Sequence, residues 1–168
     1  MSCKYLLDSN IFIQAKNDHY GFDFCPAFWD WLILKNNSSV VGSLDSIKKE
    51  LLKGKDYLSE WVRDVGKNLF IKADASTVKK IPIVNEWVEK RRNYSDSAKA
   101  DFFKVDFQLV AYALAHDCIV VSREQSAKES KKRVKIPDVC EGLGVRCVLP
   151  YTMLQNEQAR FVLGTANP

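Results

Sequence analysis

Histidine and paired cysteine are scarce in this chain, and their scarcity limits the kinds of site that it can form. Only two of the 168 residues are histidine, and the five cysteines are scattered without a Cys-x-x-Cys pair. This pattern argues against a zinc ribbon or finger, and the odd cysteine count argues against a disulfide framework. Cys118 lies inside an apolar run, where we expect a small core residue.

Long apolar runs are lacking as well. No uncharged apolar stretch approaches the roughly 20 residues needed to cross a bilayer, so a membrane span is excluded. The apolar stretch at the start of the chain is too short for a signal peptide, because an acidic residue, Asp8, already ends it. We therefore expect a cytoplasmic protein. No repeat, low-complexity segment or Gly/Ser linker divides the chain, so we expect one domain over residues 1–168.

Charge of one sign is only slightly in excess, with 25 Lys+Arg against 21 Asp+Glu and a net charge of +4. This balance alone does not indicate a nucleic-acid partner, but the distribution of charge is uneven. The segment 123–135 has two acids and the basic residues Arg123, Lys128, Lys131, Lys132, Arg133 and Lys135. It is either a solvated loop or a segment that contacts phosphates.

Short apolar runs alternate with helical patterns along the chain. The expected strands are Lys4–Leu7, Val40–Val41, Leu69–Ile71, Cys118–Val121 and Val145–Leu149. Helices are expected over Ile47–Leu51, Ala75–Lys90 (despite Pro82) and Lys104–His116, and further helices are expected to begin at Pro26, Asp56, Ile136 and Pro150. Between them, the polar stretch Lys90–Ser97 is expected to be a loop. Strands that are apolar on both sides and alternate with helices predict an α/β sandwich around a parallel sheet.

Four carboxylates fall where such a fold gathers ligands. Asp8 directly follows the first strand, and Glu124 stands three residues after Val121, so both are expected at the carboxyl edge of the sheet. Asp106 begins an apolar helical stripe, and Glu50 flanks the buried face of its own helix. The alternative is that Asp8 is a helix N-cap or turn residue and that Asp106 merely caps its helix and interacts with its dipole.

Several carboxylates at one edge repel each other unless a cation is present. Oxygen ligands without histidine or cysteine nearby are typical of Mg²⁺ or Mn²⁺ sites. Such ions activate water and stabilise a phosphodiester during in-line displacement. The pattern therefore predicts a magnesium- or manganese-dependent site for phosphodiester chemistry.

Two segments of the chain resemble the signatures of PIN domains. Tyr5–Phe12 has the apolar strand, the aspartate and an asparagine two residues on, and Val105–Ala113 with Ile119–Glu124 resembles the second signature. The chain is similar in particular to the DUF4411 branch of PIN-like proteins, of the VapC-like toxin superfamily. That similarity depends on Pro26–Leu32, Glu50–Asp56 and Lys135–Cys140.

The resemblance implies a three-layer α/β/α sandwich with a central, mostly parallel sheet. It also implies a metal-dependent ribonuclease, often the toxin of a bacterial toxin–antitoxin pair, with Asp8, Glu50 and Asp106 as metal ligands. The fourth acid of the family corresponds to Glu124, with Ser122 in the position of a threonine and Asn10 in support. Whether Glu124 contacts metal directly, and whether Asp101 joins the cluster, stays open.

The leading hypothesis is thus an endoribonuclease that prefers single-stranded RNA, although structured RNA is also a candidate substrate. The candidate RNA-backbone contacts are Lys48, Lys53, Arg123, Lys131, Lys132 and Arg133, and the aromatic residues Phe28, Trp29, Trp31 and Trp61 either stack bases or pack in the core. The alternatives are a PIN-like module that binds RNA or protein without cutting and an RNA-processing nuclease that is not a toxin. A phosphatase with a nucleophilic aspartate is disfavoured, because Asn10 stands where that chemistry needs a second acid.

A partner is also expected, because PIN-like toxins are held inactive by an antitoxin. Trp29 and Trp31 lie about 200° apart around one helix, so the helix cannot bury both on a single face. One of them requires cover from another element of this chain or from another chain. A homodimer, an antitoxin contact beside the acidic site and packing within the chain remain open.

Overall fold

The computed structural model describes residues 3–164 and centres on a five-stranded sheet. Every neighbouring pair of strands is parallel, and the order is β3-β2-β1-β4-β5. The strands are β1 (Tyr5–Leu7), β2 (Val41–Leu44), β3 (Phe70–Ile71), β4 (Ile119–Val121) and β5 (Cys147–Val148). The expected domain, 1–168, extends at both ends beyond the residues described.

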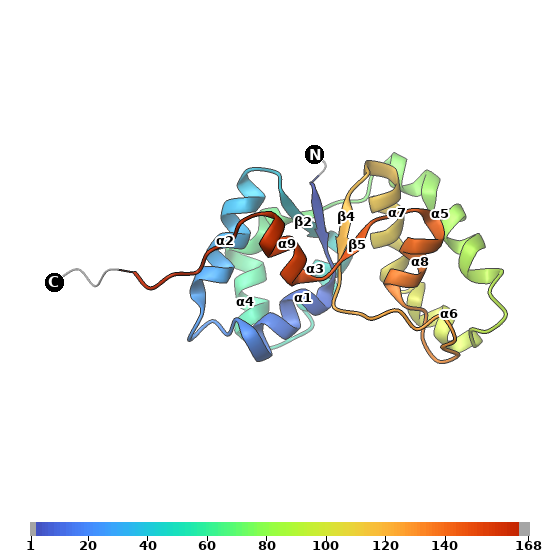
Figure 1. Ribbon diagram of the computed structural model, residues 1–168, viewed down its shortest axis with the longest axis horizontal. Coiled ribbons are helices and arrows are strands. Elements are labelled where there is room, and N and C mark those ends of the chain that lie inside the picture. Colours follow the sequence, from blue (N-terminus) through green and yellow to red (C-terminus); the bar gives the residue numbers. More distant parts are fainter. Residues whose placement is uncertain (1–2, 165–168) are drawn as a thin grey trace.

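Helices cover both faces of the sheet (Figure 1). On one side lie α2 (Pro26–Asn37), α4 (Tyr57–Asp64) and α9 (Pro150–Asn156), and on the other α5 (Ala75–Glu89), α7 (Asp106–His116) and α8 (Ile136–Leu143). The remaining helical segments are α1 (Ser9–Gln14), the π-helix η1 (Ala15–His19), α3 (Asp45–Leu51), the short 3₁₀ turn η2 (Gly66–Leu69) and α6 (Asp96–Phe102). The predicted α/β sandwich is confirmed.

The sheet is buried on both faces because its central strands carry no polar alternation. Each residue of β1 and β4 is buried, and helix α7 presents its predicted apolar stripe, including Leu109 and Val110, to the core. Pro82 is accommodated inside α5 as predicted. The five cysteines are free thiols. No helix within residues 3–164 is long and apolar enough to cross a bilayer.

The structure corrects the prediction in several segments. The segment 90–97 is not wholly loop, because Ser95 caps α6 by accepting from the Ala98 amide. With Ala98 and Phe102 as its buried residues, this short helix has little apolar periodicity to reveal it. β2 runs to Leu44, beyond the expected Val40–Val41, and within it the Ser43 hydroxyl donates to the Leu7 carbonyl at 2.8 Å.

The aromatic side chains of α2 pack within the chain. Trp29 stacks on Phe22 with ring centroids 3.8 Å apart, meets Trp61 edge-on at 5.0 Å and donates from Nε1 to the Tyr20 carbonyl. Trp31 is also buried, on a different face of the helix. The idea that these rings stack RNA bases is therefore wrong, and of the alternatives for covering both tryptophans the structure shows intrachain packing.

Candidate active site

The candidate site lies where the strand order reverses. The central strand β1 has β2 and β3 on one side and β4 and β5 on the other. In an open parallel sheet, the carboxyl ends of strands at such a reversal frame a crevice for ligands. Asp8 directly follows β1, and its amide donates to the carbonyl of Val121, the last residue of β4, at 3.0 Å. The first predicted acid therefore stands at this crevice.

Asp8 is almost fully buried and held by short polar side chains. Its carboxylate accepts from Ser122 Oγ at 3.2 Å and from Asn10 Nδ2 and Ser9 Oγ at 3.4 Å. Burial, and then the charge of Glu124, raise the pKa of Asp8 to about 6 in spite of these hydrogen bonds. Asp8 occupies the N-cap position of α1, as the alternative expected, but its side chain makes no capping hydrogen bond to that helix.

Asp106 and Glu50 are carboxylates without a protein partner. Asp106 is the first residue of α7 and is partly buried, yet its carboxylate makes no hydrogen bond or ion pair with any residue between 3 and 164. The side chain of Glu50, in α3, likewise has none among those residues. Burial raises the pKa of Asp106 to about 7, and the charges of Asp8, Glu124 and Glu50 contribute. The four predicted acids thus form one electrostatic cluster.

Glu124 differs because its carboxylate already has partners. Oε2 accepts from the amide of Ile136, the first residue of α8, at 2.8 Å. Oε1 lies 3.6 Å from Lys135 Nζ and 3.9 Å from Arg133 Nη2. The Glu124 amide in turn donates to Ser122 Oγ, which links this acid to Asp8 through one hydroxyl. Glu124 therefore connects the acid cluster to the loop 125–135.

A cleft of about 510 Å³ opens beside three of the four acids, whereas Asp8 is buried next to it and does not line it. Glu50, Asp106 and Glu124 line it together with Asn10, and Lys53, Lys104 and Arg133 place positive charge along it. Asp101 also lines the cleft, but its exposed carboxylate pairs with Lys104 at 2.7 Å, which lowers the pKa of Asp101. Asp101 is therefore a neutralised acid on the wall, unlike the partnerless Asp106.

The predicted basic residues do not all meet at this cleft. Lys53 and Arg133 line it, whereas Arg123 lines a separate small pocket with Tyr151 and lies 3.8 Å from Asp18. Lys131 and Lys132 are exposed on the loop beside Arg133.

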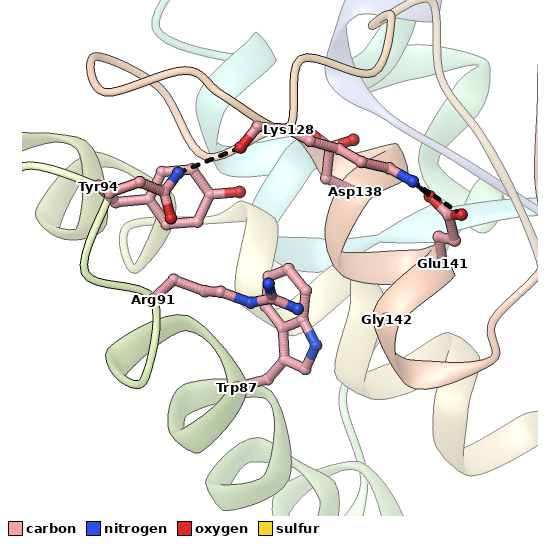
Figure 2. A pocket seen from close by; sticks show the side chains of 8 residues that line it. Trp87, Arg91, Tyr94, Lys128, Asp138, Glu141 and Gly142 are labelled. Atoms are coloured by element: carbon pink, nitrogen blue, oxygen red, sulfur yellow. Dashed lines mark hydrogen bonds and ion pairs between the residues drawn. The ribbon is translucent and has the colours of Figure 1, made fainter.

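A pocket of about 380 Å³ lies between α5, α8 and the other side of the same loop (Figure 2). The Arg91 guanidinium lies over the Trp87 ring at 4.2 Å, and Lys128 pairs with Glu141 at 2.9 Å. Asp138, which is buried, accepts from the Ala127 amide at 3.0 Å and from the Ser126 hydroxyl. The carboxylates of this pocket thus all have partners, in contrast to Asp106 and Glu50 of the cleft.

The donor set of the cleft fits a hard divalent cation. It consists of carboxylate oxygens, and two of them belong to side chains that lack any protein partner within the described part of the chain. Carboxylate and water oxygens are the ligands that Mg²⁺ and Mn²⁺ prefer. Within residues 3–164, however, no three acidic, histidine or cysteine side chains converge tightly enough to coordinate an ion as they stand. The chemistry fits, and binding would require the acids to move closer together.

The acidic cleft thus lies at the switch point of a parallel sheet that helices cover on both faces. The fold of the protein is similar to that of one chain in the crystal structure of VapBC2 from Rickettsia felis, bound to a DNA fragment from the promoter. The TM-score is 0.53 at 13% identity, over 86% of this chain and 97% of that one. At this identity the likeness concerns the fold alone.

The family assignment follows from the sequence match. Residues 5–161 match the family described as Domain of unknown function (DUF4411). The chain therefore belongs to the DUF4411 family. No curated protein matches the chain significantly. The resemblance to the DUF4411 branch of PIN-like proteins is thus confirmed.

Proposed function

We propose that this protein is a metal-dependent endoribonuclease. The observation that carries the proposal is the pair of partnerless carboxylates, Asp106 and Glu50, in one cluster with the buried Asp8. A buried acid without a partner lowers the stability of a fold, and such groups concentrate at functional sites. A bound cation would offset this cost.

Asp8, Glu50 and Asp106 are the proposed metal ligands. Glu124 keeps its bonds to α8 and the loop, so we assign it to orienting the site and to binding through water. When bound, Mg²⁺ or Mn²⁺ would acidify a coordinated water and neutralise charge on the phosphodiester. Arg133, Lys53 and Lys104, which line the same cleft, would bind and orient the RNA phosphates.

We further propose that the protein is the toxin of a toxin–antitoxin pair and acts in the cytoplasm, as one domain. Support comes from the PIN-like fold and from the likeness to a chain of VapBC2. The antitoxin would be a protein that covers the acidic cleft and keeps RNA out. Expression of the wild type should then arrest bacterial growth, whereas expression of Asp8→Asn should not. Arrest by both forms would contradict a toxin role that depends on cleavage.

The catalytic proposal is tested by cleavage of a mixed RNA pool with Mg²⁺ or Mn²⁺. Asp8→Asn and Asp106→Asn should each reduce the rate at least ~100-fold, since both would remove a metal ligand. Asp101→Asn is the matched control, because that acid lines the cleft but is neutralised by Lys104. Wild-type protein that cleaves no RNA with either ion would favour the alternative, a PIN-like module that binds without cutting.

A further inference from the structure

A second groove continues the acidic cleft along the carboxyl edge of the sheet. Its volume is about 460 Å³, and its lining shares Glu50, Lys53, Lys104 and Val105 with the cleft. The rest of its wall comes from Leu44 at the end of β2, from α3, from residues 72–73 after β3, and from Gln108 of α7. Because β3 is the edge strand on this side, the groove leads from the acid cluster toward the border of the sheet.

The groove carries an excess of positive charge. Its lining has four lysines, Lys49, Lys53, Lys72 and Lys104, against the two acids Asp45 and Glu50. Lys53 and Lys72 make no ion pair within the part of the chain that the structure describes. Lys49 pairs with Asp45 at 3.0 Å, but the Lys49 side chain is 76% exposed. An exposed pair of this kind contributes little and exchanges readily for another anion.

Helix geometry explains why these particular lysines face the groove. Lys49 and Lys53 are four residues apart, so they lie on one side of α3 and its C-terminal turn, together with Ser46 and Glu50. Lys48 is rotated by about 100° from Lys49 and belongs to a neighbouring face. The proposed metal ligand Glu50 and the two lysines therefore lie in one row along α3 and its C-terminal turn. The sequence positions of the basic residues alone do not show this arrangement.

We propose that this lysine groove binds the phosphates of the RNA strand on one side of the bond to be cleaved, with Lys49 and Lys72 as its outer contacts. This inference rests on the proposed function. A cleft whose floor is acidic repels a polyanion, and the strand must be held by positive charge beside it. The continuity of the two cavities and the unpaired Lys72 supply such a path.

The test uses Lys49→Gln/Lys72→Gln, because these lysines line the groove but not the cleft. The matched control is Lys67→Gln/Lys79→Gln, which changes the net charge equally at exposed lysines without an ion pair among residues 3–164. Binding of a labelled single-stranded RNA of about 12 nucleotides is measured in chelator over a salt series. The groove variant should bind about 10-fold more weakly at low salt, and its log–log salt slope should fall by roughly 1.4, or 0.7 per phosphate contact.

A second measurement compares cleavage of that strand with cleavage of a dinucleotide, in Mg²⁺ or Mn²⁺. The groove variant should lower kcat/KM for the long strand and leave the dinucleotide unaffected, because a dinucleotide does not reach the outer lysines. Unchanged affinity and slope, or an equal loss with the control variant, would overturn the groove assignment. Wild-type protein that binds RNA through these lysines but cleaves none would support the groove and refute the proposed nuclease.

Discussion

Substitution of Asp106 by asparagine should stabilise the metal-free protein. The pKa of this carboxyl is raised from 3.8 to about 7, first by burial and then by the charges of Asp8, Glu124 and Glu50. The folded protein therefore retains a proton that the unfolded chain has lost, and stability is lost as the pH rises from about 4 to about 7. At about 1.4 kcal/mol per pKa unit, the ionised side chain costs at most about 4 kcal/mol above pH 7. Water in the cleft screens these charges, so we expect a measured gain of roughly 2 kcal/mol.

Urea denaturation in chelator, at a series of pH values, measures this gain. The difference between Asp106→Asn and wild type should be largest above pH 7 and should vanish only as the pH falls below about 4, where the acid becomes protonated in the unfolded chain as well as in the folded protein. Asp101→Asn is the control. Lys104 lowers the pKa of Asp101, so removing the Asp101 carboxylate should not increase the free energy of unfolding. A loss of stability in Asp106→Asn, or a gain that does not depend on pH, would refute the view that Asp106 belongs to a self-repelling cluster.

Three further results are expected. Mg²⁺ or Mn²⁺ should raise the melting temperature of wild type more than that of Asp8→Asn, because a ligand stabilises only the state that binds it; equal shifts would remove Asp8 from the ligand set. Gly142→Ala should lower the free energy of unfolding by about 1–3 kcal/mol, since a Cβ there would overlap the Trp87 indole; urea titration would show no loss if α8 can shift. Trp29→Ala should cost about 3–5 kcal/mol without changing the mass in solution by light scattering, and a changed mass would indicate a contact between chains.

The layer architecture could be predicted from local patterns because the central strands of the sheet are uninterrupted apolar runs. β1 and β4 are short runs of buried apolar residues that each precede a polar position, and α7 has a regular apolar stripe. Such patterns depend only on side-chain polarity and spacing. Helix α6 escaped prediction because a seven-residue helix with two buried anchors has almost no period to detect. The cap at Ser95 was the available signal, and serine is common in loops as well.

For the candidate site, the sequence identified the acids but not which of them have a hydrogen-bond or ion-pair partner. Asp8 and Glu124 could be placed at one edge because each follows a strand of a parallel sheet. Nothing local distinguishes Asp101, which an exposed lysine neutralises, from Asp106, which has no partner among residues 3–164. The bond from the Ile136 amide to Glu124 spans twelve residues and depends on how the loop 125–135 returns to the sheet.

The sequence by itself determined the class of fold, the ends of β1, β3 and β4, and the set of candidate carboxylates, because polarity patterns and turn positions act over a few residues. Tertiary structure alone decided which lysines face the cleft, that Arg123 faces elsewhere, and that both α2 tryptophans are covered within the chain. The physical reason is that charge interaction and burial depend on distance in space. Lys53 and Arg133, for example, are far apart in sequence and line one cleft only in the folded chain.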